Sequence, residues 1–198
     1  MSETTAHEWT VLRAAHQALR SAVHGVADGD WNRVTPCEGW TVTQVLQHAA
    51  GDQIGFAAFL TGAPGPSENP FAPSGVLDRT PVEVAEEAMA ASAAGWATVG
   101  EDVEEVPVPV PPGKMPATLG VGACALDAAV HAWDIAVATD QPSPLGPELA
   151  RELMPVATSI VEPLRAYGAY APALEPVDGD GDLAALLRHL GRRPDWSA

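Results

Sequence analysis

Apolar side chains recur every three or four residues along the N-terminal segment, and this spacing constrains the fold more than any other feature of the sequence. The repeat consists of Trp9, Leu12, His16, Leu19, Val23 and Val26. Residues three and four positions apart share one face of an α-helix, so the spacing predicts an amphipathic helix. Thr5 and Glu8 have the spacing of a capping box, which predicts the helix start, and Asp28 and Gly29 predict its end.

A second capping box, Thr41 with Gln44, predicts a helix that continues to about Leu60. The inward face of this helix is predicted to carry Val45, Ala49, Phe56 and Phe59. The next residues, 62–79, are dense in proline, glycine and serine and show no periodicity, which predicts a long surface loop. Loops of this length are often functional.

A third helix is predicted from Thr80 to about Gly100. Thr80 and Glu83 form a capping box, and Pro81 lies between them at the first helical position. Residues 104–118 then alternate valine with proline. Because proline cannot donate to a central ladder, this segment predicts extended chain or an edge hairpin.

The C-terminal half of the sequence predicts three more helices. Residues 117–139 are rich in alanine and contain no proline, which predicts a long helix. A fifth helix is predicted over 148–170, and a short final one over 183–190, capped by Asp182. With no repeat and no second domain evident, the sequence predicts an all-α fold in one domain over 1–198. Its simplest form is a four-helix bundle with a long loop and a short extra C-terminal helix.

The charge balance excludes several functional classes. Against 26 acidic residues stand only 10 Lys and Arg, which gives a net charge of −16. This field repels phosphate backbones and anionic lipids, so we expect no nucleic-acid partner and no membrane. The N-terminus, MSETTAHEW, is polar and acidic, which argues against a signal peptide. Cys37 and Cys124 form no disulfide or metal-finger pattern, so a cytoplasmic location is expected.

Ionisable side chains form a narrow stripe on the predicted fourth helix. The stripe consists of Cys124, Asp127, His131 and Asp134, at spacings of three, four and three. Adjacent helical turns bring such carboxylate and imidazole donors together, as a divalent metal requires. The alternative is that the stripe is the solvated face of an amphipathic helix. Apolar residues on both sides of the stripe favour the metal, because unpaired buried charges are costly.

A further ligand has to come from another helix, as in other metal-binding bundles. His48 in the second helix is the best candidate, with Asp52 one turn further on. Its alternative role is that of a core or boundary histidine. His16 in the first helix has a similar ambiguity, between support of a ligand and a place in the core. The remaining histidines are expected at the surface: His7, His24 and His189.

Two segments together carry a family resemblance. TPCEGWTVTQVLQHAAGD (Thr35–Asp52) and AVHAWDIAVATDQP (Ala129–Pro142) resemble the metal-binding domain of the mycothiol-dependent maleylpyruvate isomerase family, part of the DinB/YfiT-like group. PGKMPA (Pro112–Ala117) and LLRHLGRRPDW (Leu186–Trp196) are similar to the same family. The resemblance therefore covers most of the chain. It implies a DinB-like four-helix bundle that binds a divalent metal, typically zinc.

Residue by residue, the resemblance places the three metal ligands of the family at His48, Asp127 and His131. The family commonly has glutamate where this sequence has the shorter Asp127, so Asp134 or a water is the alternative third ligand. Asp134 also matches the aspartate of the family's HxWD string, which could orient a ligand histidine. Trp40 is interpreted either as a wall of the pocket or as a core anchor at a helix start.

The resemblance implies chemistry with mycothiol, a low-molecular-weight thiol, as cosubstrate. High alanine and proline usage with a single lysine is typical of a high-GC actinobacterium, in which mycothiol would be available. The isomerase itself carries an extra C-terminal domain, so its maleylpyruvate reaction is not carried over. We expect a metal-dependent enzyme that transfers a thiol to a small electrophilic substrate or isomerises it with a thiol's help.

Two alternatives remain at this point. One is a metal-assisted hydrolase or cyclase of secondary metabolism, and the other is a metal-binding bundle without catalytic activity. Cys37 would need a nearby base to act as a nucleophile, and the sequence assigns none. A homodimer is compatible with the sequence, since most soluble oligomers are symmetric and bundles of this type often pair.

Overall fold

Six α-helices and one short β-hairpin form the part of the chain that the computed structural model describes, residues 8–100 and 102–198. The helices are α1 (Thr10–His24), α2 (Val42–Thr61), α3 (Pro81–Trp96), α4 (Ala117–Ala138), α5 (Pro147–Arg165) and α6 (Asp182–His189). The strands β1 (Val106–Pro107) and β2 (Lys114–Met115) pair antiparallel. The all-α fold class is therefore confirmed, and the proline-rich segment forms a hairpin.

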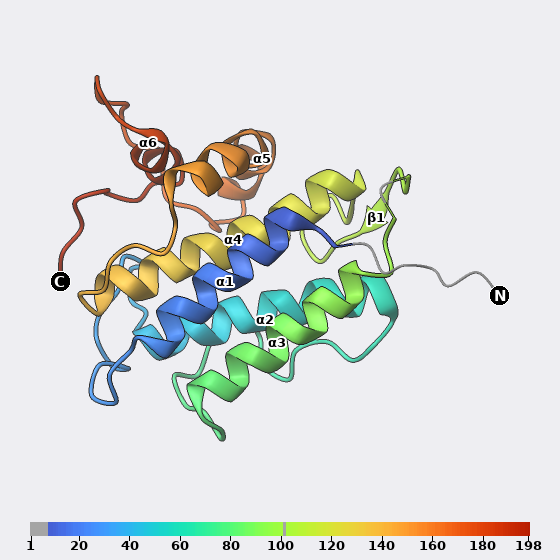
Figure 1. The fold of residues 1–198 in the computed structure, drawn as a ribbon, viewed down its shortest axis with the longest axis horizontal. Coiled ribbons are helices and arrows are strands. Elements are labelled where there is room, and N and C mark those ends of the chain that lie inside the picture. The colour runs from blue at the N-terminus through green and yellow to red at the C-terminus, as the bar shows by residue number, and fades with distance from the viewer. Residues whose placement is uncertain (1–7, 101) are drawn as a thin grey trace.

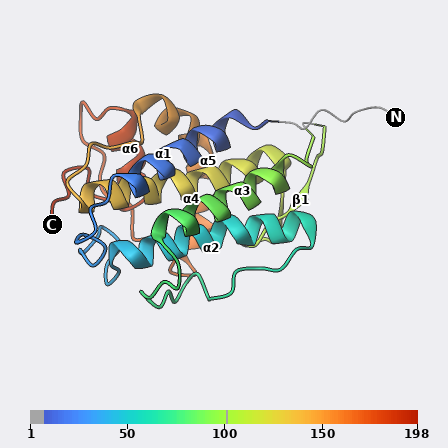
Figure 2. The same ribbon diagram turned by 60° about the horizontal axis from the view of Figure 1, so that its bottom comes forward.

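Helices α1 to α4 form a bundle in which each helix has two principal neighbours. Both α1 and α2 pack against α3 and α4, so α1 and α2 occupy opposite corners of the bundle. Figure 1 shows the four helices side by side, with α5 and α6 on the side of α4 and α1. The turned view in Figure 2 shows the same arrangement from below. The predicted four-helix bundle with C-terminal additions is confirmed.

Helix α4 is the central core element of the bundle. By length and composition it could cross a membrane, but 89% of its apolar window is buried inside the fold, as expected for a core helix. Its ionisable stripe is buried as well. Asp134 is 0% exposed and His131 is 7% exposed. The interpretation of the stripe as a solvated face is therefore wrong, because the helix is covered by protein on nearly all sides.

Two of the three predicted capping boxes mark helix starts in the described part of the chain, and the prediction from Thr5 and Glu8 is wrong because the N-cap of α1 is Trp9. The boxes that begin at Thr41 and Thr80 both form, with the hydroxyl and the third helical residue bonded reciprocally to the backbone. Thr5 lies outside the described residues, and α1 begins only at Thr10. Asp182 is not a cap: it is the first residue of α6, and its carboxylate pairs with Arg151.

Two predictions about exposure are wrong. Phe59 is 51% exposed, because the last turn of α2, residues 58–61, is half-buried or exposed throughout and offers no core position. His189 is half-buried on α6 rather than exposed. His24 is exposed as expected, and His7 lies outside the described residues.

Candidate metal centre

Three candidate ligands converge between α2 and α4. His48 lies in the middle of α2, whereas Asp127 and His131 lie one turn apart on α4. Asp127 Oδ1 is 3.5 Å from His48 Nε2 and 3.3 Å from His131 Nε2. The two imidazole rings are perpendicular, with centroids 4.7 Å apart. All three donor atoms lie within 4.8 Å of one another, close enough to hold one metal ion.

The spacing of these donor atoms fits a divalent metal. Zinc bonds of about 2.0 to 2.1 Å at tetrahedral angles place ligand atoms about 3.3 Å apart. The two separations at Asp127 Oδ1 are close to this value. The other oxygen, Asp127 Oδ2, is buried and has no hydrogen-bond partner among the described residues. A cation would compensate the cost of burying it, and two imidazoles with one carboxylate form a typical catalytic zinc set.

The outer nitrogen of His48 is held by the loop between α2 and α3. His48 Nδ1 lies 2.9 Å from the carbonyl oxygen of Pro70. A carbonyl oxygen can only accept a hydrogen bond, so Nδ1 carries the proton and Nε2 is left as the nitrogen that faces Asp127. The loop comes close to α2 at Gly51, where a Cβ atom would lie 2.7 Å from Pro70 Cγ. Glycine at this position therefore permits the contact that orients His48.

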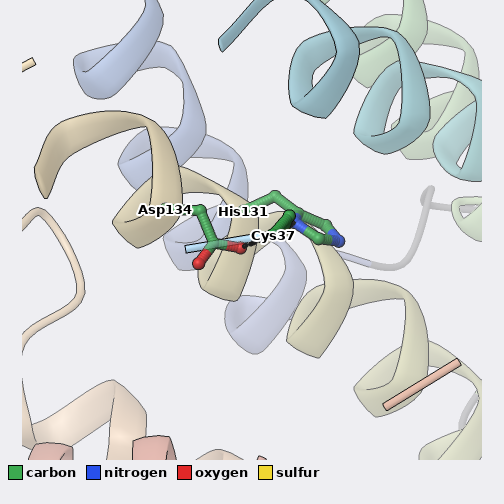
Figure 3. A group of neighbouring side chains, drawn as sticks. All are labelled: Cys37, His131 and Asp134. Atoms are coloured by element: carbon green, nitrogen blue, oxygen red, sulfur yellow. Dashed lines mark hydrogen bonds and ion pairs between the residues drawn. The ribbon is translucent and has the colours of Figure 1, made fainter. Parts of the chain in front are cut away.

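The outer nitrogen of His131 is held by Asp134, as Figure 3 shows, with Nδ1 2.9 Å from Oδ2. A carboxylate in this position fixes the orientation of a ligand histidine. Cys37 Sγ lies 3.2 Å from the same oxygen and 3.9 Å from His131 Nδ1. Cys37, His131 and Asp134 are also close enough to hold a cation. However, the guanidinium of Arg192 already donates to both oxygens of Asp134.

A tight turn places Cys37 beside His131 and Asp134. Thr35 Oγ1 accepts from the backbone N–H of Cys37 at 3.2 Å and donates to the carbonyl of Trp40 at 2.9 Å. Gly39 within the turn has φ +81°, a conformation that favours glycine. The TPCEGW string therefore folds locally, and it places a thiol and an indole beside the candidate ligands.

Two aromatic rings flank His48. The Trp40 ring centroid lies 5.1 Å from that of His48, and the Phe71 centroid lies 5.6 Å from it. Trp40 is half-buried and packs against the core, as a core anchor does, and its role as a wall of the pocket stays a prediction. Phe71 belongs to the long loop after α2 and is 59% exposed. The two rings give the approach to His48 an apolar border.

In the metal-free protein the charges of Asp127 and His131 stabilise one another. Burial acts to raise the pKa of Asp127, but His131 and His48 outweigh it and hold this pKa well below its usual range. Burial acts to lower the pKa of His131, yet Asp127 and Asp134 raise this pKa well above its usual value. A metal therefore has to displace a proton from His131.

Asp52 is an acidic neighbour of the cluster. Its Oδ2 lies 4.0 Å from His48 Nε2, and its side chain is 14% exposed. Burial, with a further contribution from the charge of Asp127, raises the pKa of Asp52 to about 7. A carboxyl group with this pKa can take up or release a proton near neutral pH.

His16 is not part of this cluster among the described contacts. Its Nε2 is hydrogen-bonded to Gln53 Oε1 at 2.8 Å, and Gln53 Nε2 donates to the carbonyl of Cys124 at 3.1 Å. The network joins α1, α2 and α4 inside the bundle. His16 is therefore a hydrogen-bonded core histidine.

Three contacts of the site were not predicted from the sequence: the carbonyl of Pro70, the ring of Phe71 and the guanidinium of Arg192. The first lies 22 residues from its partner His48, and the last lies 58 residues from its partner Asp134. Helical spacing relates residues only three or four apart, so it cannot find such pairs. Arg192 does lie inside the LLRHLGRRPDW string, which was the one available signal.

Comparisons with known proteins agree on the nature of the fold. The model of the family described as the mycothiol maleylpyruvate isomerase N-terminal domain matches residues 12–136. Uncharacterized proteins from two strains of Mycobacterium tuberculosis are each 33% identical over 153 residues, which is 75% of this chain and 76% of theirs. The crystal structure of the mycothiol-dependent maleylpyruvate isomerase superposes with a TM-score of 0.52 at 21% identity. That match covers 72% of this chain and 66% of the isomerase chain, just under two thirds of its length.

Proposed function

Because this chain belongs to the family of the mycothiol maleylpyruvate isomerase N-terminal domain, we propose that it is a metal-dependent enzyme of thiol chemistry. Its substrate in this proposal is a small electrophile, to which mycothiol is transferred or which isomerises with the help of mycothiol. The isomerase that shares its fold is itself mycothiol-dependent. A cytoplasmic location, where the thiol stays reduced, accords with this role.

The observation that carries the proposal is the convergence of His48 Nε2 and His131 Nε2 on Asp127 Oδ1. The other oxygen of this carboxylate, Oδ2, is buried and lacks a partner among the described residues. These three side chains would hold the metal and leave a further coordination position for a ligand. A divalent metal supplies a Lewis acid there, which lowers the pKa of a bound thiol or polarises a substrate carbonyl.

The surrounding side chains would each serve the reaction in a different way. The carbonyl of Pro70 and the carboxylate of Asp134 hold the two imidazoles with Nε2 toward Asp127. Asp52 is placed to accept the proton that the thiol loses when its sulfur forms a bond to the electrophilic carbon. In an isomerisation the C–S bond then breaks and the same carboxyl can return the proton to the departing thiolate; in a thiol transfer it can give the proton to the substrate, and the adduct is the product. Neither route involves a net redox change.

The border of the site favours small and apolar substrates. Trp40 and Phe71 flank His48 and offer flat apolar surface. The guanidinium of Arg192 is paired with both oxygens of Asp134. A substrate therefore gains contact with aromatic rings at this border, and Arg192 is not free to bind a substrate carboxylate.

The proposal is tested with zinc-loaded protein, mycothiol and a panel of electrophiles that includes maleylpyruvate and uncharged aromatic halides. Consumption of the electrophile is followed by absorbance with and without the thiol. We expect thiol-dependent turnover that His131→Ala abolishes and that His24→Ala leaves unchanged, because His24 is an exposed side chain on α1.

The outcomes separate the three functional classes. Turnover that requires the thiol supports the proposal. Turnover at the same rate without thiol contradicts it and indicates a metal-assisted hydrolase or cyclase. Zinc binding with no turnover of any electrophile also contradicts it and indicates a non-catalytic metal-binding bundle.

A further inference from the structure

Arg192 connects the C-terminal segment to α4. Its Nε donates to Asp134 Oδ1 at 2.8 Å, and its Nη2 donates to Asp134 Oδ2 at 2.7 Å. The arginine side chain is only 11% exposed, and the aspartate is fully buried. Two parallel bonds of this kind fix both the position and the charge of a carboxylate. Arg192 lies outside residues 12–136, the segment that the family model matches.

The backbone around Arg192 is built to hold it in this place. The N–H of Arg192 donates to the carbonyl of Leu187 at 2.8 Å, which closes the end of α6. Gly191 has φ +78°, and a Cβ atom there would lie 2.8 Å from the backbone oxygens of Ala171 and Pro172. Only glycine fits this turn without strain. The chain therefore enters Arg192 in a fixed direction, with α6 packed on α5 behind it.

The oxygen that Arg192 holds is the one that faces His131. Asp134 Oδ2 accepts from His131 Nδ1 at 2.9 Å as well as from the guanidinium. Without Arg192, this oxygen would keep His131 Nδ1 and the thiol of Cys37 as its donors among the described residues, and Asp134 Oδ1 would lose the bond from Arg192 Nε. The carboxylate would then be free to rotate, and the imidazole that it holds would lose its fixed direction toward Asp127.

We propose that Arg192 is a positioning residue of the metal centre, acting through Asp134 to hold the His131 ring with Nε2 directed at Asp127. The inference rests on the proposed function, because it assigns the C-terminal segment a role in the same metal site. It adds a third layer to the site: the metal ligand His131, the carboxylate behind it, and the guanidinium that holds this carboxylate in place.

The test is a zinc titration against a competing chromophoric chelator, carried out on a double-mutant cycle. The variants are Arg192→Gln, Asp134→Asn and the combination of both. Arg188→Gln is the matched control, because Arg188 lies in α6 four residues before Arg192 and its partner is Asp180, at 2.9 Å. The free energy of unfolding of each zinc-free variant is measured in urea, so that loss of fold and loss of zinc affinity are separated.

We expect Arg192→Gln to weaken zinc binding about 10-fold, the lower end of the usual effect of removing a direct partner of a ligand histidine, because Arg192 acts through Asp134. Arg188→Gln should bind zinc as the parent does. In the Asp134→Asn background, the Arg192→Gln change should have no further effect beyond about twofold, since the two residues act in series.

Three results would overturn the inference. Zinc affinity of Arg192→Gln within about twofold of the parent would show that the guanidinium does not position His131. Equal losses in the parent and Asp134→Asn backgrounds would show that it acts by another route. If Arg192→Gln fails to fold, Arg192→Lys replaces it, with one hydrogen bond in place of two, and parent-like affinity in that variant contradicts the inference. A parent that binds no zinc contradicts the proposed function as well, which distinguishes the two failures.

Discussion

At the scale of single residues, the two cysteines illustrate how position decides chemistry. Cys124 is 0% exposed in the core, and its Sγ donates to Gln53 Oε1 at 3.1 Å. Burial raises the pKa of Cys124 to about 12, so its thiol stays protonated at physiological pH. Cys37 is half-buried on the turn beside the candidate metal centre. Only one of the two thiols is therefore accessible to a reagent.

We predict that iodoacetamide at pH 8 adds one carbamidomethyl group to the folded protein, at Cys37. Cys124 should react only after unfolding, because the thiolate is the reactive form and is suppressed by burial. Peptide mass spectrometry locates the adduct, and Cys37→Ser serves as the control. Modification of Cys124 at the rate of Cys37 would show that the bundle opens around α4.

The carboxyl group of Asp52 makes the stability of the metal-free protein depend on pH. Its folded-state pKa of about 7 lies above its ordinary value of 3.8. Between these values the unfolded chain is ionised while the folded protein keeps the proton. The stability that this group contributes therefore falls as the pH rises from about 4 to about 7, and it stays low above that range.

We predict that Asp52→Asn stabilises the chelator-treated protein at pH 8 by roughly 1 to 3 kcal/mol, because asparagine has no charge to bury. The advantage should be smaller at pH 5 than at pH 8. Urea unfolding at both pH values measures it, with Asp78→Asn as the control, because the Asp78 side chain is 92% exposed. If Asp52→Asn gains more free energy of unfolding at pH 5 than at pH 8, the pH dependence is the opposite of the expected one and contradicts the raised pKa of Asp52.

Sequence spacing predicts part of the site at this scale and misses the rest for a physical reason. Asp127 and His131 are four residues apart in one helix, so their proximity follows from helix geometry alone. His48 required a choice among six histidines; its place in the second helix near Asp52 made it the best candidate, and the family resemblance implied the same residue. Arg192 and Phe71 reach the site through loops, whose paths no local pattern determines.

At the scale of secondary structure elements, the N-terminus of α2 links local sequence to the site. Thr41 Oγ1 accepts from the backbone N–H of Gln44, whose side chain in turn accepts from the N–H of Thr41. Helix α2 carries His48 two turns later. The same end of the helix adjoins the turn that bears Cys37 and Trp40, so one cap anchors several parts of the site.

We predict that Thr41→Ala lowers the free energy of unfolding by about 1 kcal/mol, the usual cost of losing an N-cap. Urea denaturation followed by circular dichroism measures the change. Thr158→Ala is the matched control, since Thr158 is an exposed residue inside α5 that bonds only one turn back, to the carbonyl of Met154. Equal losses in the two variants would mean that the capping box does not stabilise α2.

The first residues of the helices could be predicted from the sequence more reliably than their last residues. Ser, Thr and acidic side chains at a helix start make specific bonds to free N–H groups, and these leave a visible pattern. Helix α3 ends at Trp96 rather than near Gly100, and α5 ends at Arg165 rather than near Tyr170. Where a helix stops depends on the packing of its last turn, as the exposed Phe59 of α2 also shows.

At the scale of the whole molecule, the candidate metal centre joins parts of the chain that are distant in sequence. Helix α2 and helix α4 supply the donors, the loop after α2 orients His48, and the C-terminal segment reaches Asp134. The net charge of −16 gives the whole molecule a negative field that attracts cations. The bundle class follows from apolar periodicity, but this convergence emerges only from the packed fold.

The central claim is that His48, Asp127 and His131 bind one metal ion, and zinc stoichiometry tests it most directly. Parent protein, His48→Ala, His131→Ala and the surface variant His24→Ala are treated with chelator, exchanged into equal zinc, desalted and measured by elemental analysis. We predict about one zinc per chain in the parent and His24→Ala, and almost none in the two site variants. Parent-like zinc in His48→Ala or His131→Ala would contradict the claim.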